Sequence, residues 1–390
     1  MTVLFANPPW WDIDPVGRRI LGGVRGGGHR DFLAPSRSAP DRHIFGDYTP
    51  HPHLLASAAA YVDRRGAARV LWRDSIVIRE SYEAFFNCVR SASPDAVVIA
   101  SSSRSLAHDA KIVRQMRRIL PRVRIVLSGD FAPGEPSSDL PLHAVVPAEC
   151  ELPVLRVIEG AVGSQAAEPL EEAALNAAPP PFFDDSTGHL YCDPIPHGEL
   201  ASVCPRFPQV HVRTARDRRR FSATFLRHHL AELLARFAPK SVYFAGNGDD
   251  LEEARLLELA ALMSGFRIQW SVPMPAVPLA SSTWIALRRS GCHGVRIAVT
   301  PTLIRSACPA PSEFMSIAEN VARAKALGMS AHVGFLHAAW GESPAAKQAA
   351  VEILGADPAC HSIQDHAPCE GPFLELVEIR TPRVETLAAA

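Results

Sequence analysis

The sequence predicts an α/β protein made of two consecutive domains with parallel sheets. Short apolar runs rich in Val, Ile and Phe alternate with segments of helical periodicity over most of the chain, which is the pattern of repeated βα units. A stretch rich in Ala, Glu and Pro interrupts this alternation, as a linker does. We therefore expect a doubly wound domain at 1–163, a linker at 164–206, a second βα domain at 207–372 and a C-terminal tail at 373–390.

The first domain is expected to contain five buried strands joined by helices. Apolar strands that alternate with helices form a parallel sheet covered on both faces. In chain order the strands read VLFANPP, AARVLWRDS, DAVVIASSS, VRIVLSGD and HAVVPAE. Helical periodicity is found at 53–65, 81–92 and 109–120, and in ELPVLRVIEGAV after the last strand.

Six further strands are expected after the linker. Six βα units are too few to close an eightfold barrel, so an incomplete barrel or a second open sheet is predicted. The strands read QVHVRTA, SVYFAGN, RIQWSVPM, GVRIAVTP, SAHVGFLHA and CHSIQDHAP. Helices are expected at 222–237, 250–264, 281–290, 312–327 and 343–354.

Composition narrows the classes of function. The chain has 40 Lys and Arg against 41 Asp and Glu, so it has no overall field that would recruit nucleic acid or an anionic membrane. No apolar run approaches the roughly 20 residues of a spanning helix, and TVLFANPPW has no features of a secretory leader. We therefore expect a cytoplasmic protein that acts on a small-molecule substrate. The eight cysteines include no C-x2-C or C-x3-C pair, so their spacing predicts no metal site.

A co-linear series of motifs carries a family resemblance. The first domain contains VLFANPPWW, RIVLSGDFA and VVPAECELPVLRVIEG, and the second contains YFAGN, IQWSVPM and WIALRRSGCHGVRIAVTP. In this order they resemble the cobalamin-binding class of radical S-adenosylmethionine enzymes. The resemblance implies a cobalamin-binding Rossmann-like domain followed by a partial (βα)6 barrel of the radical S-adenosylmethionine type.

Small and polar residues end the strands of the first domain, where ligands of doubly wound sheets bind. By themselves these residue types favour capping and turning roles, whereas the resemblance implies that they bind cobalamin. The D-x-H-x-x-G signature with which other cobalamin proteins supply a His to cobalt is absent, so no lower ligand of cobalt is identified. The residues predicted to bind cobalamin are Asn7, Pro8, Pro9, Ser101, Ser102, Ser103, Gly129, Asp130, Glu149 and Glu151.

The resembled family carries a C-x3-C-x2-C cluster loop after the first barrel strand, and this chain does not. Its segment at 210–225 reads VHVRTARDRRRFSATF, without a cysteine. Because guanidinium groups cannot replace thiolates as iron ligands, we expect no iron–sulfur cluster and no reductive cleavage of S-adenosylmethionine. The chain is then a degenerate member of the family. Arg213 and Arg216 are candidates to bind a substrate carboxylate or phosphate; for most of the run, a solvated turn is the alternative.

Other polar residues fall at predicted strand ends of the second domain and indicate a pocket. Asn247 and Trp340 are candidates for substrate binding. His337, Asp365 and His366 are catalytic candidates, since a His paired with an Asp transfers protons near neutral pH. No metal ligand is predicted among the side chains, and intact S-adenosylmethionine is a second candidate ligand.

Three functions follow. The first is a cobalamin-dependent transferase or cyclase-like enzyme of natural-product biosynthesis, with methyl or group transfer or redox chemistry in the interdomain cleft. The second is a non-catalytic cobalamin carrier, sensor or partner of a catalytic paralogue. The third is a protein of the same architecture that binds a different flat cofactor. The polar residues at the predicted barrel mouth favour the enzyme.

Overall fold

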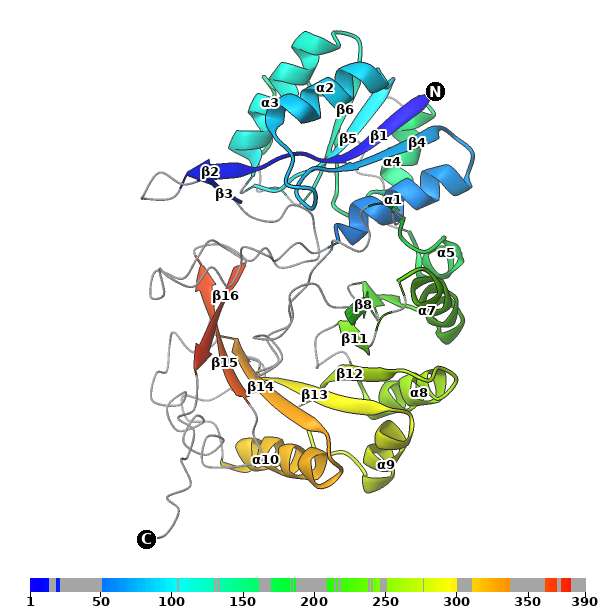
Figure 1. Ribbon diagram of the computed structural model, residues 1–390, viewed down its shortest axis with the longest axis vertical. Helices are drawn as coiled ribbons and strands as arrows, with labels where there is room; N and C mark the ends of the chain where they lie inside the picture. The colour runs from blue at the N-terminus through cyan, green and yellow to red at the C-terminus, as the bar shows by residue number, and fades with distance from the viewer. Residues whose placement is uncertain are drawn as a thin grey trace. The chain divides into compact units, whose positions relative to one another are not determined.

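The computed structural model describes most of both predicted domains (Figure 1). It covers residues 1–13, 19–21, 51–160, 170–186, 209–245, 251–299, 311–336, 362–369 and 373–379, without positions 104, 130, 132, 133, 183, 185, 214, 217, 218, 238, 240 and 276. Contacts divide the chain into two compact units, Met1–Asp193 with Ala235–Phe237, and Pro194–Leu234 with Ala238–Ala390. The division falls inside the predicted linker.

The first unit contains a five-stranded parallel sheet in the order β4-β1-β5-β6-β7. Counted along the chain, this is the 2-1-3-4-5 order of flavodoxin-like sheets, in which the winding direction reverses between the first and third strands. That switch point lies between β1 and β5. The strands are β1 (Thr2–Asn7), β4 (Arg69–Asp74), β5 (Ala96–Ala100), β6 (Arg124–Ser128) and β7 (Ala144–Val146).

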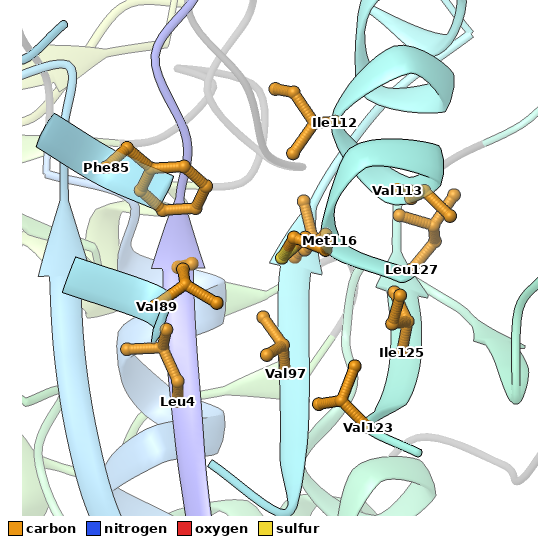
Figure 2. Close-up of a cluster of buried hydrophobic side chains, with 12 residues drawn as sticks. Leu4, Phe85, Val89, Val97, Ile112, Val113, Met116, Val123, Ile125 and Leu127 are labelled. Atoms are coloured by element: carbon orange, nitrogen blue, oxygen red, sulfur yellow. The ribbon is translucent and has the colours of Figure 1, made fainter. Parts of the chain in front are cut away.

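Helices cover both faces of this sheet. Helices α2 (Tyr82–Ala92) and α3 (Leu106–Ile119) pack on one face, where Phe85 and Met116 meet Leu4 and other strand residues in a core (Figure 2). Helices α1 (His53–Arg64) and α4 (Glu151–Ile158) contact each other on the opposite face (Figure 1). Alternate strand residues are buried on both sides, which explains the continuous apolar runs in the sequence.

Two elements of the first unit were not predicted. A short antiparallel ribbon, β2 (Trp11–Ile13) with β3 (Arg19–Leu21), follows β1, and helix α5 (Glu172–Ala177) lies within the predicted linker. Beyond α5, the Phe182 amide donates to the carbonyl of Ala56 at 3.0 Å. Its ring lies 5.7 Å from that of Trp72. This part of the linker segment therefore belongs to the first unit.

The second unit contains a seven-stranded sheet in the order β16-β15-β14-β13-β12-β11-β8. All strands of this sheet except β16 are parallel and follow chain order, as in an opened βα barrel. Strand β16 lies in the predicted tail and adds an antiparallel edge. The bounds are β8 (Gln209–Arg213), β11 (Ser241–Ala245), β12 (Gln269–Met274), β13 (Cys292–Val299), β14 (Ser330–Leu336), β15 (Ser362–Cys369) and β16 (Phe373–Ile379).

Four described helices connect these strands. They are α7 (Ala223–Phe237), α8 (Glu253–Met263), α9 (Ser281–Arg289) and α10 (Pro311–Ala326); the helix predicted at 343–354 lies outside the described residues. Trp270 and Trp284 are fully buried in this unit. The prediction of an α/β protein with parallel sheets is confirmed. Across the described parts of both units, none of the helices combines the length and apolarity needed to cross a bilayer.

Helix α7 carries a buried histidine, His229, that links folding to pH. Burial lowers its pKa from 6.5 to about 4, and His228 adds to the shift. Above the ordinary pKa the side chain is neutral in both states, whereas between the two pKa values only the unfolded chain takes up a proton. We therefore expect the free energy of unfolding to fall by up to about 3 kcal/mol over this window as the solution is acidified.

Urea denaturation between pH 7 and 4 (the lower limit being the folded pKa) measures this dependence. His229→Leu should make it shallower, because no group then titrates at this position; His143 and His293, whose pKa values burial also lowers, account for part of the remainder. His228→Ala, at an exposed neighbouring position, should keep most of it. A wild-type slope that His229→Leu leaves unchanged would contradict the assignment.

Candidate functional site

The carboxyl edge of the first sheet brings together residues from three predicted strand ends. Asn7 is the last residue of β1, Ser101 directly follows β5, and Gly129 directly follows β6. Strand register aligns these ends, with Ala6 beside Ile99 and Ala100 beside Ser128. Asn7 and Ser101 therefore flank the switch point, which is where doubly wound sheets bind ligands.

The side-chain nitrogen of Asn7 is hydrogen-bonded, whereas its side-chain oxygen has no donor among the described residues. It is 2% exposed, and its Nδ2 donates to Asp74 Oδ1 at 3.0 Å. The same carboxylate oxygen accepts the amides of Ile76 and Val77 at 3.0 and 3.3 Å. Asn7 Oδ1 is buried and has no hydrogen-bond partner among the described residues. Because a buried acceptor without a donor is costly, this position favours a ligand that supplies an N–H or O–H group.

The serines after β5 are organised around a buried carboxylate. Ser101 Oγ and Ser105 Oγ donate to Asp109 Oδ2 at 2.7 and 2.6 Å, and Asp109 is 0% exposed. The Ser102 amide donates to Ser105 Oγ at 3.1 Å. The hydroxyl of Ser101 is thus engaged within the protein and supports the loop. Ser102 is half-buried, and its hydroxyl meets the hydroxyl and the amide of Ser105 at 3.3 and 3.4 Å, whereas Ser103 is exposed.

Gly129 lets two strand ends approach closely. A Cβ atom at this position would lie 2.1 Å from the carbonyl oxygen of Ser101. The Gly129 amide also donates to the Val146 carbonyl at 3.1 Å. Glycine is therefore required here by the protein's own backbone, beyond the prediction that it leaves space for a cofactor.

The remaining predicted positions of this edge lie beside these three. Pro8 and Pro9 are buried directly after Asn7, and Glu149 is half-buried after β7. Glu151 begins α4 and is 2% exposed, and a carboxylate in the first turn of a helix is favoured by the helix dipole. Asp130 lies outside the described residues.

An aromatic cluster, which sequence reasoning missed, stands next to this edge; it consists of Trp10, Trp11, Tyr82 and His108. The Trp11 amide donates to Tyr82 Oη at 3.1 Å, and Tyr82 Oη is hydrogen-bonded to His108 Nε2. The Trp10 ring is 5% exposed and its centroid lies 6.4 Å from that of His108. The signal in the sequence was the Trp pair after the first strand, together with polar aromatics at two expected helix starts.

An ion pair between half-buried Arg73 and buried Glu80 fixes the loop after β4. Arg73 Nε donates to Glu80 Oε2 at 3.0 Å, and Ser75 Oγ donates to the same oxygen at 2.7 Å. The hydrogen bond to Glu80 raises the pKa of Arg73. The Glu80 carbonyl accepts the indole N–H of Trp11 at 2.8 Å, so this loop also positions the aromatic cluster.

In the second unit, the arginine-rich segment forms a hairpin. Strand β9 (Ala215–Arg216) pairs with β10 (Arg219–Arg220), and Arg216 lies opposite Arg219. Arg220 pairs with Glu252 at 3.4 Å, both of them exposed, and such a pair contributes little stability. An ordinary surface contact therefore explains one arginine of the run.

The chain after the hairpin is anchored by buried contacts. Phe221 is 5% exposed, and its ring stacks on that of Phe225 with the centroids 4.5 Å apart. The carbonyl of Phe221 accepts a hydrogen bond from the guanidinium of Arg255, which is itself buried. Arg255 and Phe225 therefore anchor the chain at Phe221, directly after the hairpin.

The other predicted residues of the second unit are only partly described. Arg213 ends β8 beside Ala245. Asp365 and His366 lie within β15, beside Phe335 and Leu336 of β14. Asn247, His337 and Trp340 lie outside the described residues. Among the residues that the structure describes, no group of three or more His, Cys, Asp or Glu is arranged to hold a metal ion.

Comparison with known proteins gives matches among solved structures only. No family model matches the sequence, and no curated protein does. The radical S-adenosylmethionine methyltransferase TsrM from Kitasatospora setae, solved with cobalamin and a 4Fe–4S cluster, is 13% identical, with a TM-score of 0.56 over 91% of this chain and 73% of TsrM. TsrM solved with tryptophan and an S-adenosylmethionine analogue gives 12% identity and the same TM-score over 93% of this chain and 72% of TsrM.

The cobalamin-dependent S-adenosylmethionine radical enzyme OxsB, in its apo form, gives a TM-score of 0.51 at 12% identity over 86% of this chain. The chain spans about half, 49%, of the length of OxsB. At these identities the likeness shows a shared fold. The resemblance drawn from the order of motifs is confirmed at that level.

Proposed function

We propose that this chain is a cobalamin-dependent transferase or cyclase-like enzyme that acts on a small molecule without an iron–sulfur cluster. The observation that carries the proposal is the carboxyl edge of the first sheet. There Asn7 presents a buried acceptor, unpaired among the described residues, at the switch point. The fold shared with cobalamin-dependent enzymes adds support.

The residues of this edge suit a corrinoid. The corrin ring carries amide side chains whose N–H groups donate hydrogen bonds. Asn7 Oδ1, which has no donor among the described residues, is suited to accept one of them. Ser102 and Ser103 bring hydroxyls that accept or donate hydrogen bonds. When bound, cobalamin supplies a cobalt centre that carries a methyl group or exchanges electrons. The role of the protein is to bind the corrin ring, to orient it and to exclude water from it.

The residues present do not suit an iron–sulfur cluster. Residues 210–225 contain no cysteine, and Arg255 and Phe225 hold the described end of this segment. We derive no step that needs an electron from such a cluster. Loss of the cysteines also favours a second candidate function, a non-catalytic cobalamin carrier or sensor.

Substrate contacts are proposed from charge and position. Arg213 and Arg216 supply fixed positive charge for a carboxylate or phosphate, and Asn247 and Trp340 extend the same site. His337, Asp365 and His366 are proposed to move a proton on the substrate. Intact S-adenosylmethionine remains a candidate methyl donor.

Corrinoid binding is the first test. Purified protein is incubated with hydroxocobalamin or methylcobalamin, passed through gel filtration and examined by ultraviolet–visible spectroscopy. We expect about one equivalent of corrinoid to co-elute. Asn7→Leu should weaken binding at least about tenfold, since one buried hydrogen bond is lost. Asn87→Leu, at an exposed site on α2, is the matched control and should bind as wild type does.

The outcomes separate the parts of the proposal. A colourless protein after gel filtration would contradict cobalamin binding. Stoichiometric iron and sulfide after anaerobic reconstitution would contradict the cluster-free assignment. Full corrinoid binding without turnover of any methyl acceptor or redox substrate would favour the carrier or sensor.

A further inference from the structure

Six exposed arginines of the first unit lie at the amino edge of its sheet, opposite the carboxyl edge that is proposed to bind cobalamin. They are found where helices α1, α2 and α3 end and strands β4, β5 and β6 begin. We call them the amino-edge arginines: Arg64, Arg65, Arg69, Arg90, Arg118 and Arg122.

Backbone hydrogen bonds hold these helix–strand turns side by side. The Arg69 amide donates to the Met1 carbonyl and the Asp95 amide to the Thr2 carbonyl, both at 2.9 Å. The Arg124 amide in turn donates to the Asp95 carbonyl at 3.0 Å. Strands β4 and β6 are three strand spacings apart, so the starts of the three strands lie within about 15 Å along this edge. The amino-edge arginines therefore share one surface.

The protein does not use these guanidinium groups in ion pairs among its described residues. No carboxylate in the described part of the chain lies within ion-pair distance of any of the six. Three of them donate to neutral side chains of their own helix, Arg65 to Tyr61, Arg90 to Asn87 and Arg118 to Gln115. The other three have no hydrogen bond to a described residue, namely Arg64, Arg69 and Arg122.

The positive charge of this surface exceeds the negative charge placed beside it. The same helix ends and turns contain two acidic residues, Asp63 and Asp95, and Asp95 Oδ2 already accepts the Thr2 amide at 2.7 Å. Each helix C-terminus adds roughly half a negative charge, which still leaves an excess of about two positive charges. Met1–Asp193 as a whole carries 20 Lys and Arg against 23 Asp and Glu, so the excess is a local feature of this edge.

We infer that the amino edge of the first sheet is a docking surface for an acidic protein. Guanidinium groups bind carboxylates through two parallel hydrogen bonds, and Arg is enriched in protein interfaces. A second copy of this chain would bring the same positive excess to the same face and would be repelled.

The surface suits a protein better than a uniformly charged polyanion. Asp63 and Asp95 lie among the arginines and would repel a nucleic-acid backbone or an anionic membrane, whereas a protein of mixed charge can pair them with Lys. The described residues of the three turns include no exposed aromatic ring on which a base could stack.

This inference does not rest on the proposed cobalamin binding. Strand β1 has six residues, so the two edges of the sheet are separated by roughly 20 Å. Contacts at the amino edge therefore leave the carboxyl edge accessible to a ligand. We expect protein incubated with hydroxocobalamin to bind an acidic partner as tightly as untreated protein does.

Fluorescence anisotropy of a labelled acidic peptide tests the inference on the full chain. The peptide contains Glu, Ser and some Lys, with a net negative charge. Duplex DNA of the same net charge and vesicles that contain phosphatidylserine are measured in parallel. We expect the peptide to bind more tightly than either of these, and its affinity to fall as salt is added.

Charge reversal identifies the surface that binds the peptide. Arg69→Glu combined with Arg122→Glu should weaken binding at least about tenfold. Neither residue lies within a helix, so the helix ends are not disturbed. Arg227→Glu combined with Arg289→Glu is the matched control: both residues are exposed, lie in the second unit and change the net charge by the same amount. This control should bind as wild type does.

Several outcomes would overturn the inference. They are the absence of peptide binding, an equal loss of affinity in the two double variants, and competition between hydroxocobalamin and the peptide. Tighter binding of DNA or of vesicles, lost in Arg69→Glu with Arg122→Glu, would assign the surface to a nucleic acid or a membrane instead. Should that double variant fail to fold by circular dichroism, Arg69→Gln with Arg122→Gln gives the same comparison without reversing the charge. A protein that binds the peptide as expected but retains no corrinoid contradicts the proposed function alone.

Discussion

Gly129→Ala is expected to lower the free energy of unfolding by about 4 kcal/mol or more. The new Cβ would lie 2.1 Å from the Ser101 carbonyl oxygen and 2.7 Å from its carbon. Both atoms are backbone, and Ser101 is tied into the sheet by its amide, which donates to the Ser128 carbonyl at 2.8 Å. No flexible side chain can move aside, so the strand ends themselves must separate.

Urea denaturation followed by circular dichroism measures this loss. Gly265→Ala is the matched control, because its added Cβ would meet the Leu262 carbonyl at 3.4 Å, an ordinary contact, and should change stability little. Corrinoid retention should fall together with stability in Gly129→Ala, since the substitution displaces the proposed binding edge. A Gly129→Ala protein as stable as wild type would show that the described approach of the two strand ends is wrong.

Asp109→Ala is expected to lower the free energy of unfolding by about 4 kcal/mol, because it removes the carboxylate that accepts hydrogen bonds from two buried hydroxyls. Ser101 and Ser105 are both 0% exposed, so water does not readily replace the lost oxygen. Their bonds to Asp109 Oδ2 measure 2.7 and 2.6 Å. The loop after β5 should lose its shape, and with it the placement of Ser102 and Ser103.

Thermal denaturation and hydrogen exchange of the β5 and α3 amides measure this effect. Asp109→Asn keeps an acceptor oxygen of the same shape and should recover part of the stability. Asp139→Ala removes an exposed carboxylate whose partner is Arg114 at 3.5 Å, and should change stability little. Equal stabilities of Asp109→Ala and Asp139→Ala would contradict a structural role for the buried network.

The candidate residues at the proposed cofactor edge differ in whether they support the fold, the ligand or both. Gly129 and Ser101 lie at positions that the sequence predicts to bind cobalamin, yet both are engaged by the protein itself. Asn7 combines both roles, since one end of its amide holds Asp74 and the other has no partner among the described residues. We therefore expect Asn7→Leu to affect binding more than Gly265→Ala or Asn87→Leu do.

The order of the main helices and strands could be predicted from the sequence, whereas β2, β3, α5 and β16 were not predicted. Apolar runs such as VVIA and RIVLS have few alternatives to buried strands, and Ser81 caps α2 where the pattern places a helix start, accepting the Ala84 amide at 3.1 Å. Local periodicity and capping act between near neighbours, so they can be read from a linear string. The absence of cysteine at 210–225 is equally a property of the sequence alone.

Which strand ends meet, and which polar atoms have no partner among the described residues, depends on the tertiary structure. Strand order and register place Asn7 beside Asp74, 67 residues apart, and the Tyr82–His108 bond spans 26 residues. The spacing of residues in the sequence does not predict such contacts, because they depend on how the helices pack against the sheet. For the same reason the sequence could name Ser101 and Gly129 as candidates but not show that each already contacts the protein.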